Sequence, residues 1–196
     1  MQRRRFIAMT GAALASGGLA LTGCTTTPLS SSSSPGGDAG KRAAIDADVE
    51  ATLTRLYSTV HGSRELVSNA RGVLVFPSVL SAGFWIGGQY GQGALRIGGQ
   101  SSGYYSIAAA SFGLQIGAQS KAIIMLFMTQ EALDKFTSSQ GWAAGVDATV
   151  ALVRIGANGN VDTSTATSPV EAFVLTNAGL MAGVSLEGTK ISRLII

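Results

Sequence analysis

A run rich in glycine and aromatic residues, Arg71 to Ala118, constrains the fold of this chain more than any other stretch. It holds 11 of the 26 glycines and 7 of the 13 aromatic residues. Glycine weakens a helix, and aromatic side chains favour a pleated surface that is covered on one side. The run therefore predicts short, bent strands that pack around a core.

A pattern of two glycines separated by three residues recurs three times, in AGFWIGGQ (82–89), FGLQIGAQ (112–119) and AGLMAGVS (178–185). The unequal spacing of the three copies argues against a solenoid or a propeller. If each copy is one extended strand, its glycines share one face and its apolar residues share the other. We expect three such strands in a strongly curved, mostly antiparallel β-sheet or a small barrel-like core.

Residues 43–70 change to a helical period. Their apolar residues recur at intervals of three, four and seven: Ile45, Val49, Leu53, Leu56, Val60 and Val67. We expect an N-terminal amphipathic helix, interrupted at Gly62. Either its apolar stripe packs on the sheet, or the stripe and the neighbouring basic residues contact lipid.

The remaining pattern predicts further strands and one short inserted helix, which makes the fold α+β. Pro77 is expected to end a strand at 73–76, and Ala122 to Met128, apolar on both faces, is either a central strand or a buried helix. Thr129 is a suitable N-cap for a helix that runs to Ser138. Asn158-Gly159 predicts a hairpin turn. The other strands are expected at 83–88, 94–97, 104–109, 112–118, 145–155, 170–175 and within 180–195.

The first 24 residues are typical of an export signal. Three arginines at 3–5 precede an apolar segment from Phe6 to Leu21, and Leu21-Thr22-Gly23-Cys24 resembles a bacterial lipobox. In such a sequence the thiol of the cysteine is acylated, and cleavage makes it the new N-terminus. Both the general secretory route and the twin-arginine route are compatible with the arginines. Thr25, where an aspartate would retain the protein at the inner membrane, favours the outer membrane.

The segment 25–40 is rich in Ser, Gly and Pro and predicts a flexible tether. The folded domain is then expected at 41–196. Acyl chains on Cys24 would hold this domain close to a membrane without any segment that crosses it.

The composition excludes several classes of site. The whole net charge of +3 comes from Arg3, Arg4 and Arg5. The rest of the chain has no net positive charge, whereas a nucleic-acid-binding domain usually has a clear excess of Lys and Arg. One cysteine and one histidine cannot form a zinc site, and no cofactor motif is present. Ser111 lies in an imperfect nucleophile motif, but a hydrolase of that class needs a histidine after the serine, and His61 precedes it. We expect a protein that is not an enzyme.

Several segments together resemble the SYLF domain. They are 70–77 (ARGVLVFP), 82–84 with 87–91 (GGQYG), 105–106, 111–119 (SFGLQIGAQ) and 179–183 (GLMAG). The resemblance extends from about Ala43 to Ile196. It implies a β-rich domain with an N-terminal helix that binds anionic lipids, and in some members actin. Actin binding is not expected of an exported bacterial lipoprotein.

The sequence thus leads to two functional hypotheses. In the first, a lipoprotein anchored through Cys24 binds phospholipid head groups or a membrane-associated partner, and its candidate head-group contacts are basic: Lys41, Arg42, Arg55, Arg64 and Arg71. In the second, the curved sheet encloses a small apolar or lipid ligand and the protein is a carrier.

Overall fold

The computed structural model describes residues 35–83, 86–112, 117–153, 161, 168–181 and 185–196. All of them belong to one compact unit, 33–196. Within these residues the helices are α1 (Pro35–Thr59), α2 (Ser63–Asn69) and α3 (Gln130–Ser138). The strands are β1 (Gly72–Gly83), β2 (Ile86–Ile97), β3 (Gln100–Phe112), β4 (Gly117–Phe127), β5 (Gly141–Ala143), β6 (Val150–Leu152), β7 (Val170–Thr176), β8 (Gly179–Leu180) and β9 (Lys190–Leu194).

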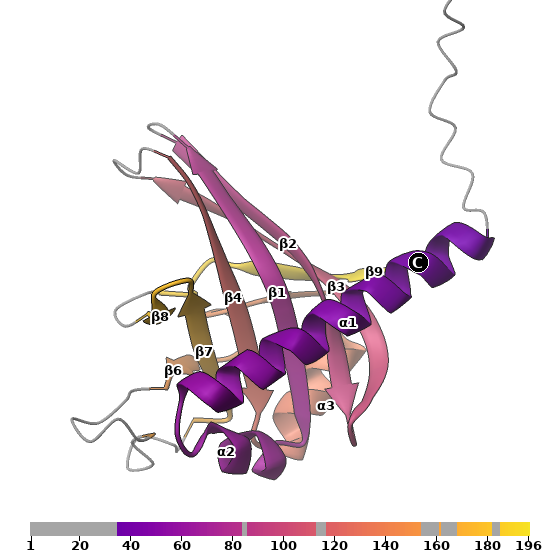
Figure 1. The fold of residues 1–196 in the computed structure, drawn as a ribbon, viewed down its shortest axis with the longest axis vertical. Helices are drawn as coiled ribbons and strands as arrows, with labels where there is room; N and C mark the ends of the chain where they lie inside the picture. Colours follow the sequence, from indigo (N-terminus) through magenta and orange to yellow (C-terminus); the bar gives the residue numbers. More distant parts are fainter. Residues whose placement is uncertain (1–34, 84–85, 113–116, 154–160, 162–167, 182–184) are drawn as a thin grey trace, which may run out of the picture. The chain divides into compact units, whose positions relative to one another are not determined.

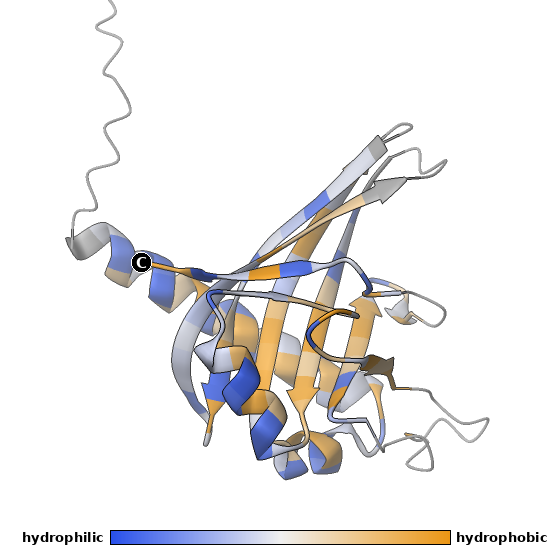
Figure 2. Cartoon of the chain, turned by 180° about the vertical axis from the view of Figure 1, so that it is seen from behind, coloured by the Kyte–Doolittle hydropathy of each residue, from blue (hydrophilic) through white to orange (hydrophobic). Residues whose placement is uncertain are grey.

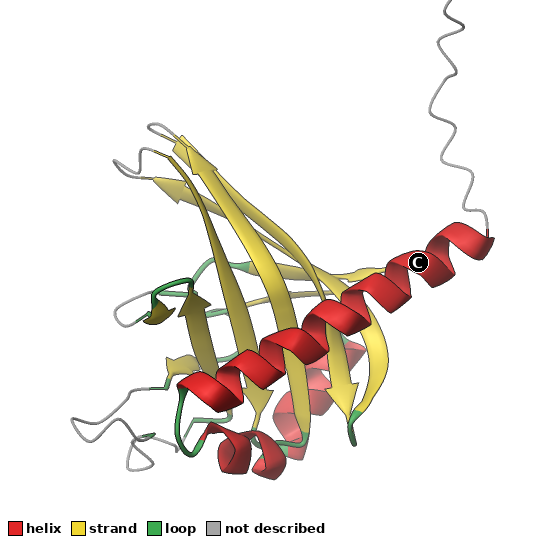
Figure 3. Cartoon of the chain, in the orientation of Figure 1, coloured by secondary structure: helices red, strands yellow, loops and turns green. Residues whose placement is uncertain are grey.

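The described strands form one curled sheet in the order β5-β9-β3-β2-β1-β4-β7-β6, and β8 pairs with β7 (Figure 1). The strand pairs are antiparallel except β6 with β7, which is parallel. Figure 3 shows α1 crossing one face of the sheet, with α3 on the other side. The expected α+β fold, with a strongly curved and mostly antiparallel sheet, is confirmed.

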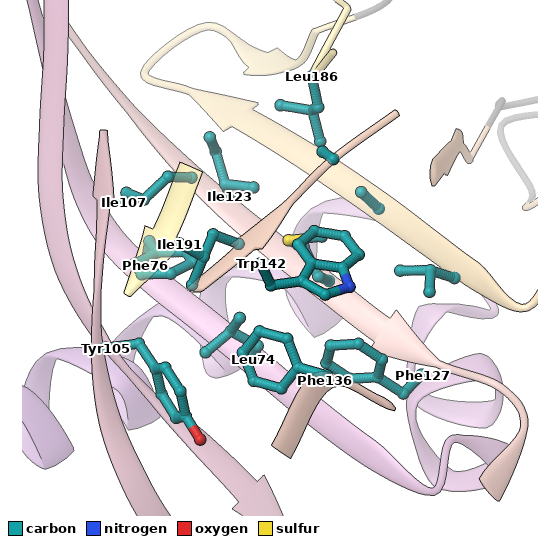
Figure 4. Packing of buried hydrophobic residues seen from close by; sticks show 14 of the residues in the cluster. Leu74, Phe76, Tyr105, Ile107, Ile123, Phe127, Phe136, Trp142, Leu186 and Ile191 are labelled. Atoms are coloured by element: carbon teal, nitrogen blue, oxygen red, sulfur yellow. The ribbon is translucent and has the colours of Figure 1, made fainter. Parts of the chain in front are cut away.

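The sheet separates two apolar clusters. The face toward α3, which we call the inner face, packs Phe76, Phe127, Phe136 and Trp142 together (Figure 4). The rings of Phe127, Phe136 and Trp142 lie between 4.8 and 6.5 Å apart, centroid to centroid, in tilted and edge-on pairs. Such pairs add about 0.5–1.5 kcal/mol beyond the burial of their area. Aromatic side chains therefore fill this side of the sheet.

The outer face is covered by α1 and α2. The apolar stripe of α1 and the residue after it, Ile45, Val49, Leu53, Leu56 and Val60, are buried against side chains from β1, β2, β4 and β7. The charged residues Arg42, Asp48 and Arg55 of the same helix are exposed, and Figure 2 shows hydrophilic residues at the end of α1 that projects past the sheet. The first of the two alternatives for the stripe, packing on the sheet, is thus the observed one.

The expected break at Gly62 and the expected N-cap at Thr129 are both confirmed. Gly62 adopts a φ of 81° between α1 and α2, a left-handed conformation that glycine adopts at little cost. Thr129 precedes α3, and its side chain accepts a hydrogen bond from the backbone N–H of Ala132. The helix α1 begins at Pro35, within the segment expected to be a tether. Proline suits the first turn of a helix, where its missing N–H has no partner to lose.

The strand predicted to end at Pro77 continues to Gly83. The pairing register of β1 shifts between Val75 and Ser78 on one side and between Phe76 and Val79 on the other. A bulge of this kind tolerates proline because the bulged residue does not complete the hydrogen-bonded ladder. Sequence alone placed a strand end where the structure has a bend.

The glycine pattern was also misinterpreted as three strands. The first copy, 82–89, spans the turn between β1 and β2, and Gly83 pairs directly with Gly87 across it. The second copy spans the end of β3 and the start of β4, and the third contains the two-residue strand β8. Residues 84–85, 113–116 and 182–184 of these copies lie outside the described residues. Cross-strand partners share a face, so the expected alignment of Gly83 with Gly87 arises from a hairpin and not from one strand.

The other strand predictions vary in accuracy. Ala122 to Met128 is confirmed as a central strand, because β4 lies between β1 and β7 and is buried on both faces. The strand expected at 145–155 is reduced to β6, three residues long. The hairpin expected at Asn158-Gly159 lies outside the described residues.

Candidate functional site

A groove of about 520 Å³ lies where the N-terminal half of α1 meets the turn between β2 and β3 and the end of β9. We call it the Arg42 pocket. Its lining combines basic, hydroxyl and apolar residues: Arg42, Ser101, Ser102, Gly103, Tyr104, Arg193, Leu194, Ile195 and Ile196. The pocket is thus assembled from three segments that are far apart in the sequence.

Arg42 is held at the rim of this pocket by one contact. Its Nη1 donates a hydrogen bond of 2.9 Å to the backbone oxygen of Ile196. The contact fixes one nitrogen of the guanidinium, which has five N–H donors. The remaining donors are suited to a carboxylate or a phosphate, because the planar fork of arginine binds such groups with two hydrogen bonds.

Asp46 joins α1 to the neighbouring strand beside the pocket. Its carboxylate accepts a hydrogen bond of 2.6 Å from the Ser101 hydroxyl and one of 2.8 Å from the Tyr104 hydroxyl. Burial raises the pKa of Tyr104, and its hydrogen bond to Asp46 raises it further because that bond favours the protonated phenol. Glu50 forms an ion pair with Arg96 one turn further along the helix. These contacts fix the wall of the pocket.

A second groove, of about 400 Å³, lies between α1 and the bulge of β1. It is lined by Ile45, Asp48, Pro77, Ser78, Leu80, Tyr90, Gly91 and Gln92. Leu80 is 60% exposed and Tyr90 is 51% exposed, which is unusual for side chains of this size. This groove is more apolar in its residues than the Arg42 pocket, and Asp48 is its one charged side chain.

The five basic residues predicted as head-group contacts do not converge. Lys41 and Arg42 lie near the start of α1, Arg55 lies near its end, Arg64 belongs to α2 and Arg71 precedes β1. Lys41 pairs with Asp38 at 3.7 Å, and Arg64 stacks over the Tyr57 ring at 4.2 Å. All five are exposed, but only Arg42 lines the Arg42 pocket. Cys24 lies outside the described residues.

The comparison with protein families identifies the domain. Residues 108–194, from β3 to the last residue of β9, match the family model described as Ysc84: Las17-binding protein actin regulator. Residues 108–194 therefore belong to the SYLF family. The segments 111–119 and 179–183, on which the resemblance was based in part, fall within the matched residues. No match was found among the curated proteins.

The side chains that line the Arg42 pocket are basic, hydroxyl-bearing and apolar. In the part of the chain that the structure describes, no group of three or more His, Cys, Asp or Glu residues could hold a metal ion. None of the described helices is long and apolar enough to span a membrane. Ser111 belongs to β3, and His61 is an exposed residue whose carbonyl oxygen accepts a hydrogen bond from the backbone N–H of Val161.

Sequence reasoning missed most of the Arg42 pocket. Ser101, Ser102 and Arg193 carry no motif, and Arg42 is 154 positions from the residue whose oxygen it contacts. The one available signal was Arg42 itself, as a basic residue beside the apolar stripe. Only the packing of α1 on the sheet selects it from the five candidates.

Proposed function

We propose that this protein is a membrane-anchored envelope lipoprotein whose SYLF domain binds phospholipid head groups in the Arg42 pocket without catalysing a reaction. The observation that carries the proposal is the pocket itself. It joins a guanidinium and two serine hydroxyls to an apolar border formed by Leu194, Ile195 and Ile196. A phosphate ester attached to an acyl-bearing glycerol has the same combination of an anion and an apolar part.

The position of the pocket in the chain supports this use. Ten residues, 25–34, separate Cys24 from the start of α1. A segment of that length spans at most about 35 Å when fully extended. If Cys24 is acylated, Arg42 belongs to the part of the domain that follows the anchor most closely along the chain.

The burial of the apolar stripe narrows the mode of binding. Leu56 and Val49 are fully buried against the sheet and are not available to insert into a bilayer. The domain is therefore expected to contact the charged surface of the membrane rather than its hydrocarbon core. Contact of this kind depends strongly on salt.

The proposed localisation rests on the export signal in residues 1–24. We place the mature protein in the cell envelope, anchored to the outer membrane on its periplasmic side or at the cell surface. The matched family is described as an actin regulator, but an exported protein would not meet cytosolic actin, so we do not extend that partner to this chain.

The proposal is tested by sedimentation of the chain from residue 25 onward with vesicles of phosphatidylglycerol and of phosphatidylcholine. We expect binding to the anionic vesicles, and we expect Arg42→Gln to weaken it about tenfold or more, as loss of a charge-assisted hydrogen bond does. Arg55→Gln is the matched control. It removes the same charge from the same helix outside the pocket, and should weaken binding by about fivefold at most.

Two results would contradict the proposal. If Arg42→Gln and Arg55→Gln weaken binding equally, the contact is a diffuse attraction and the pocket has no special part in it. If the wild-type chain binds neither vesicle at low salt, the domain does not recognise head groups. Copurification of a stoichiometric lipid that is shielded from solvent would instead favour the carrier.

A further inference from the structure

Ile195, directly after β9, is the most exposed large apolar side chain in the described part of the domain. It is 100% exposed, and the next in this respect, Val146, is 81% exposed. Single apolar side chains are common on protein surfaces and carry no meaning by themselves. Ile195 differs because it lines the Arg42 pocket, together with Arg42 and Arg193.

The backbone is held on both sides of Ile195. Leu194 pairs with Tyr104 at the end of β9, and Ile196 packs against the apolar cluster of the outer face. The backbone oxygen of Ile196 also accepts the hydrogen bond from Arg42. The exposed side chain therefore projects from a fixed part of the chain and not from a frayed end. A side chain on a fixed backbone loses little conformational freedom when it enters a partner.

The surroundings of Ile195 are basic. Arg42 and Arg193 are both exposed, and none of the described residues that line the pocket is acidic. Figure 2 shows the apolar end of the chain, marked C, next to hydrophilic residues at the projecting end of α1. An isoleucine beside two guanidinium groups suits the surface of an anionic membrane, where phosphate groups lie directly above the acyl chains.

The anchor proposed for this protein is attached near the same pocket. The chain that leads to Cys24 joins α1 at Pro35, and Arg42 follows seven residues later in the helix. Seven residues correspond to about 10 Å along a helix axis, at about 1.5 Å per residue. If Cys24 is acylated, the membrane is thus the partner closest to the pocket along the chain. This closeness favours a phospholipid bilayer over a second protein as the occupant.

We infer that Ile195 inserts between phospholipid head groups, down to the boundary with the acyl chains, when the Arg42 pocket binds a membrane. The inference rests on the proposed function and adds one apolar contact to it. The apolar stripe of α1 stays on the sheet, so the insertion is shallow and comes from a single side chain. Full burial of an isoleucine favours binding by about tenfold or more, and burial at the head-group boundary is expected to favour it by about fivefold.

A fluorescent label at position 195 tests the insertion directly. Cys24 is the only cysteine, so the chain from residue 25 onward has none, and Ile195→Cys creates a single site for the thiol-reactive dye bimane. We expect the bimane emission to shift to shorter wavelength when phosphatidylglycerol vesicles are added, because the dye leaves water. Nitroxide groups near the glycerol end of the acyl chains should quench this emission more than nitroxide groups near the chain ends.

Val146→Cys with the same label is the matched control. Val146 is also strongly exposed, and it lies beyond the other end of β9, where Ala143 pairs with Lys190. Its label should keep the emission seen in water while the protein binds the vesicles. Equal shifts at both positions would overturn the inference, because they would show that the dye itself enters the membrane.

The substitution Ile195→Ser measures the contact without a dye. We expect it to weaken binding to phosphatidylglycerol vesicles about fivefold. The melting temperature should stay that of the wild type, because a wholly exposed side chain contributes little to folding. The salt dependence of binding should also be unchanged, since an apolar contact is lost and not a charge.

The failure of this inference can be told apart from the failure of the proposed function. Wild-type affinity of Ile195→Ser, or a label at 195 that stays in water on the bound protein, would overturn the insertion. If Arg42→Gln still weakens binding in that case, head-group recognition remains and only the role of Ile195 is wrong. If the wild-type chain binds no vesicle at low salt, both are wrong.

Discussion

Glu171 is the residue whose surroundings conflict most with its chemistry. It is 2% exposed, it is the second residue of β7, and it faces the outer cluster with its partner Leu126 and with Phe173. In the described part of the structure, neither carboxylate oxygen has a hydrogen-bond partner. Burial raises the pKa of this carboxyl above its ordinary value, because a charge is poorly solvated there.

The raised pKa predicts a pH-dependent stability. The folded state binds the Glu171 proton more tightly than the unfolded state, so its contribution is fully present below the ordinary pKa of a glutamate. It is lost as the pH rises through the folded pKa. We expect Glu171→Gln to raise the free energy of unfolding by about 1–3 kcal/mol at pH 8, and to have little effect at pH 4.

Urea unfolding at both pH values, followed by circular dichroism, measures the difference. Glu65→Gln on the exposed surface of α2 is the control and should change stability at neither pH. A gain of equal size at pH 4 and pH 8 would show that the carboxyl is not the source of the effect.

For single residues, the sequence predicted those whose role depends on the local backbone conformation. The cap at Thr129 and the left-handed Gly62 depend on local geometry, and both were predictable. The Arg42 pocket was not, because Ser101, Asp46 and Ile196 meet only after the helix docks on the sheet. Residue types that act through tertiary contacts leave no local pattern.

At the scale of elements, α1 shows what periodicity can predict. The stripe identified the helix and the face that it buries, since a period of 3.6 residues has one structural explanation. The glycine pattern had two explanations. Two residues that are four positions apart in one strand share a face, and so do two residues that pair across a hairpin. Gly83 and Gly87 form such a cross-strand pair. Only the strand pairing distinguishes them.

The packing of α1 gives a prediction that separates its two original interpretations. Leu56 is fully buried among side chains of the outer cluster, so Leu56→Ala should lower the free energy of unfolding by about 2–5 kcal/mol. The folded variant should still bind anionic vesicles like the wild type. Denaturant titration and vesicle sedimentation measure the two quantities independently. A loss of vesicle binding without a loss of stability would mean that the stripe contacts lipid.

At the scale of the whole molecule, the Arg42 pocket depends on the meeting of three segments that are far apart in the sequence. It lies at the junction of α1 with the start of β3 and the end of β9. The docking of the helix on the sheet therefore forms the candidate membrane contact.

The last prediction concerns the anchor, because a head-group contact at one exposed pocket is expected to be weak without it. Three acyl chains hold a protein on a membrane far more firmly than one, since each buried CH₂ contributes about 0.8 kcal/mol. We expect Cys24→Ser to abolish incorporation of labelled palmitate and to leave residues 1–23 attached, which mass spectrometry of the purified chain detects. Arg42→Gln is the matched control, because it should lose head-group binding and yet retain both the label and the cleavage. If Cys24→Ser incorporates palmitate at the wild-type level, the lipid is attached to another residue. The cysteine at the end of the export signal would then not be the anchor of this domain.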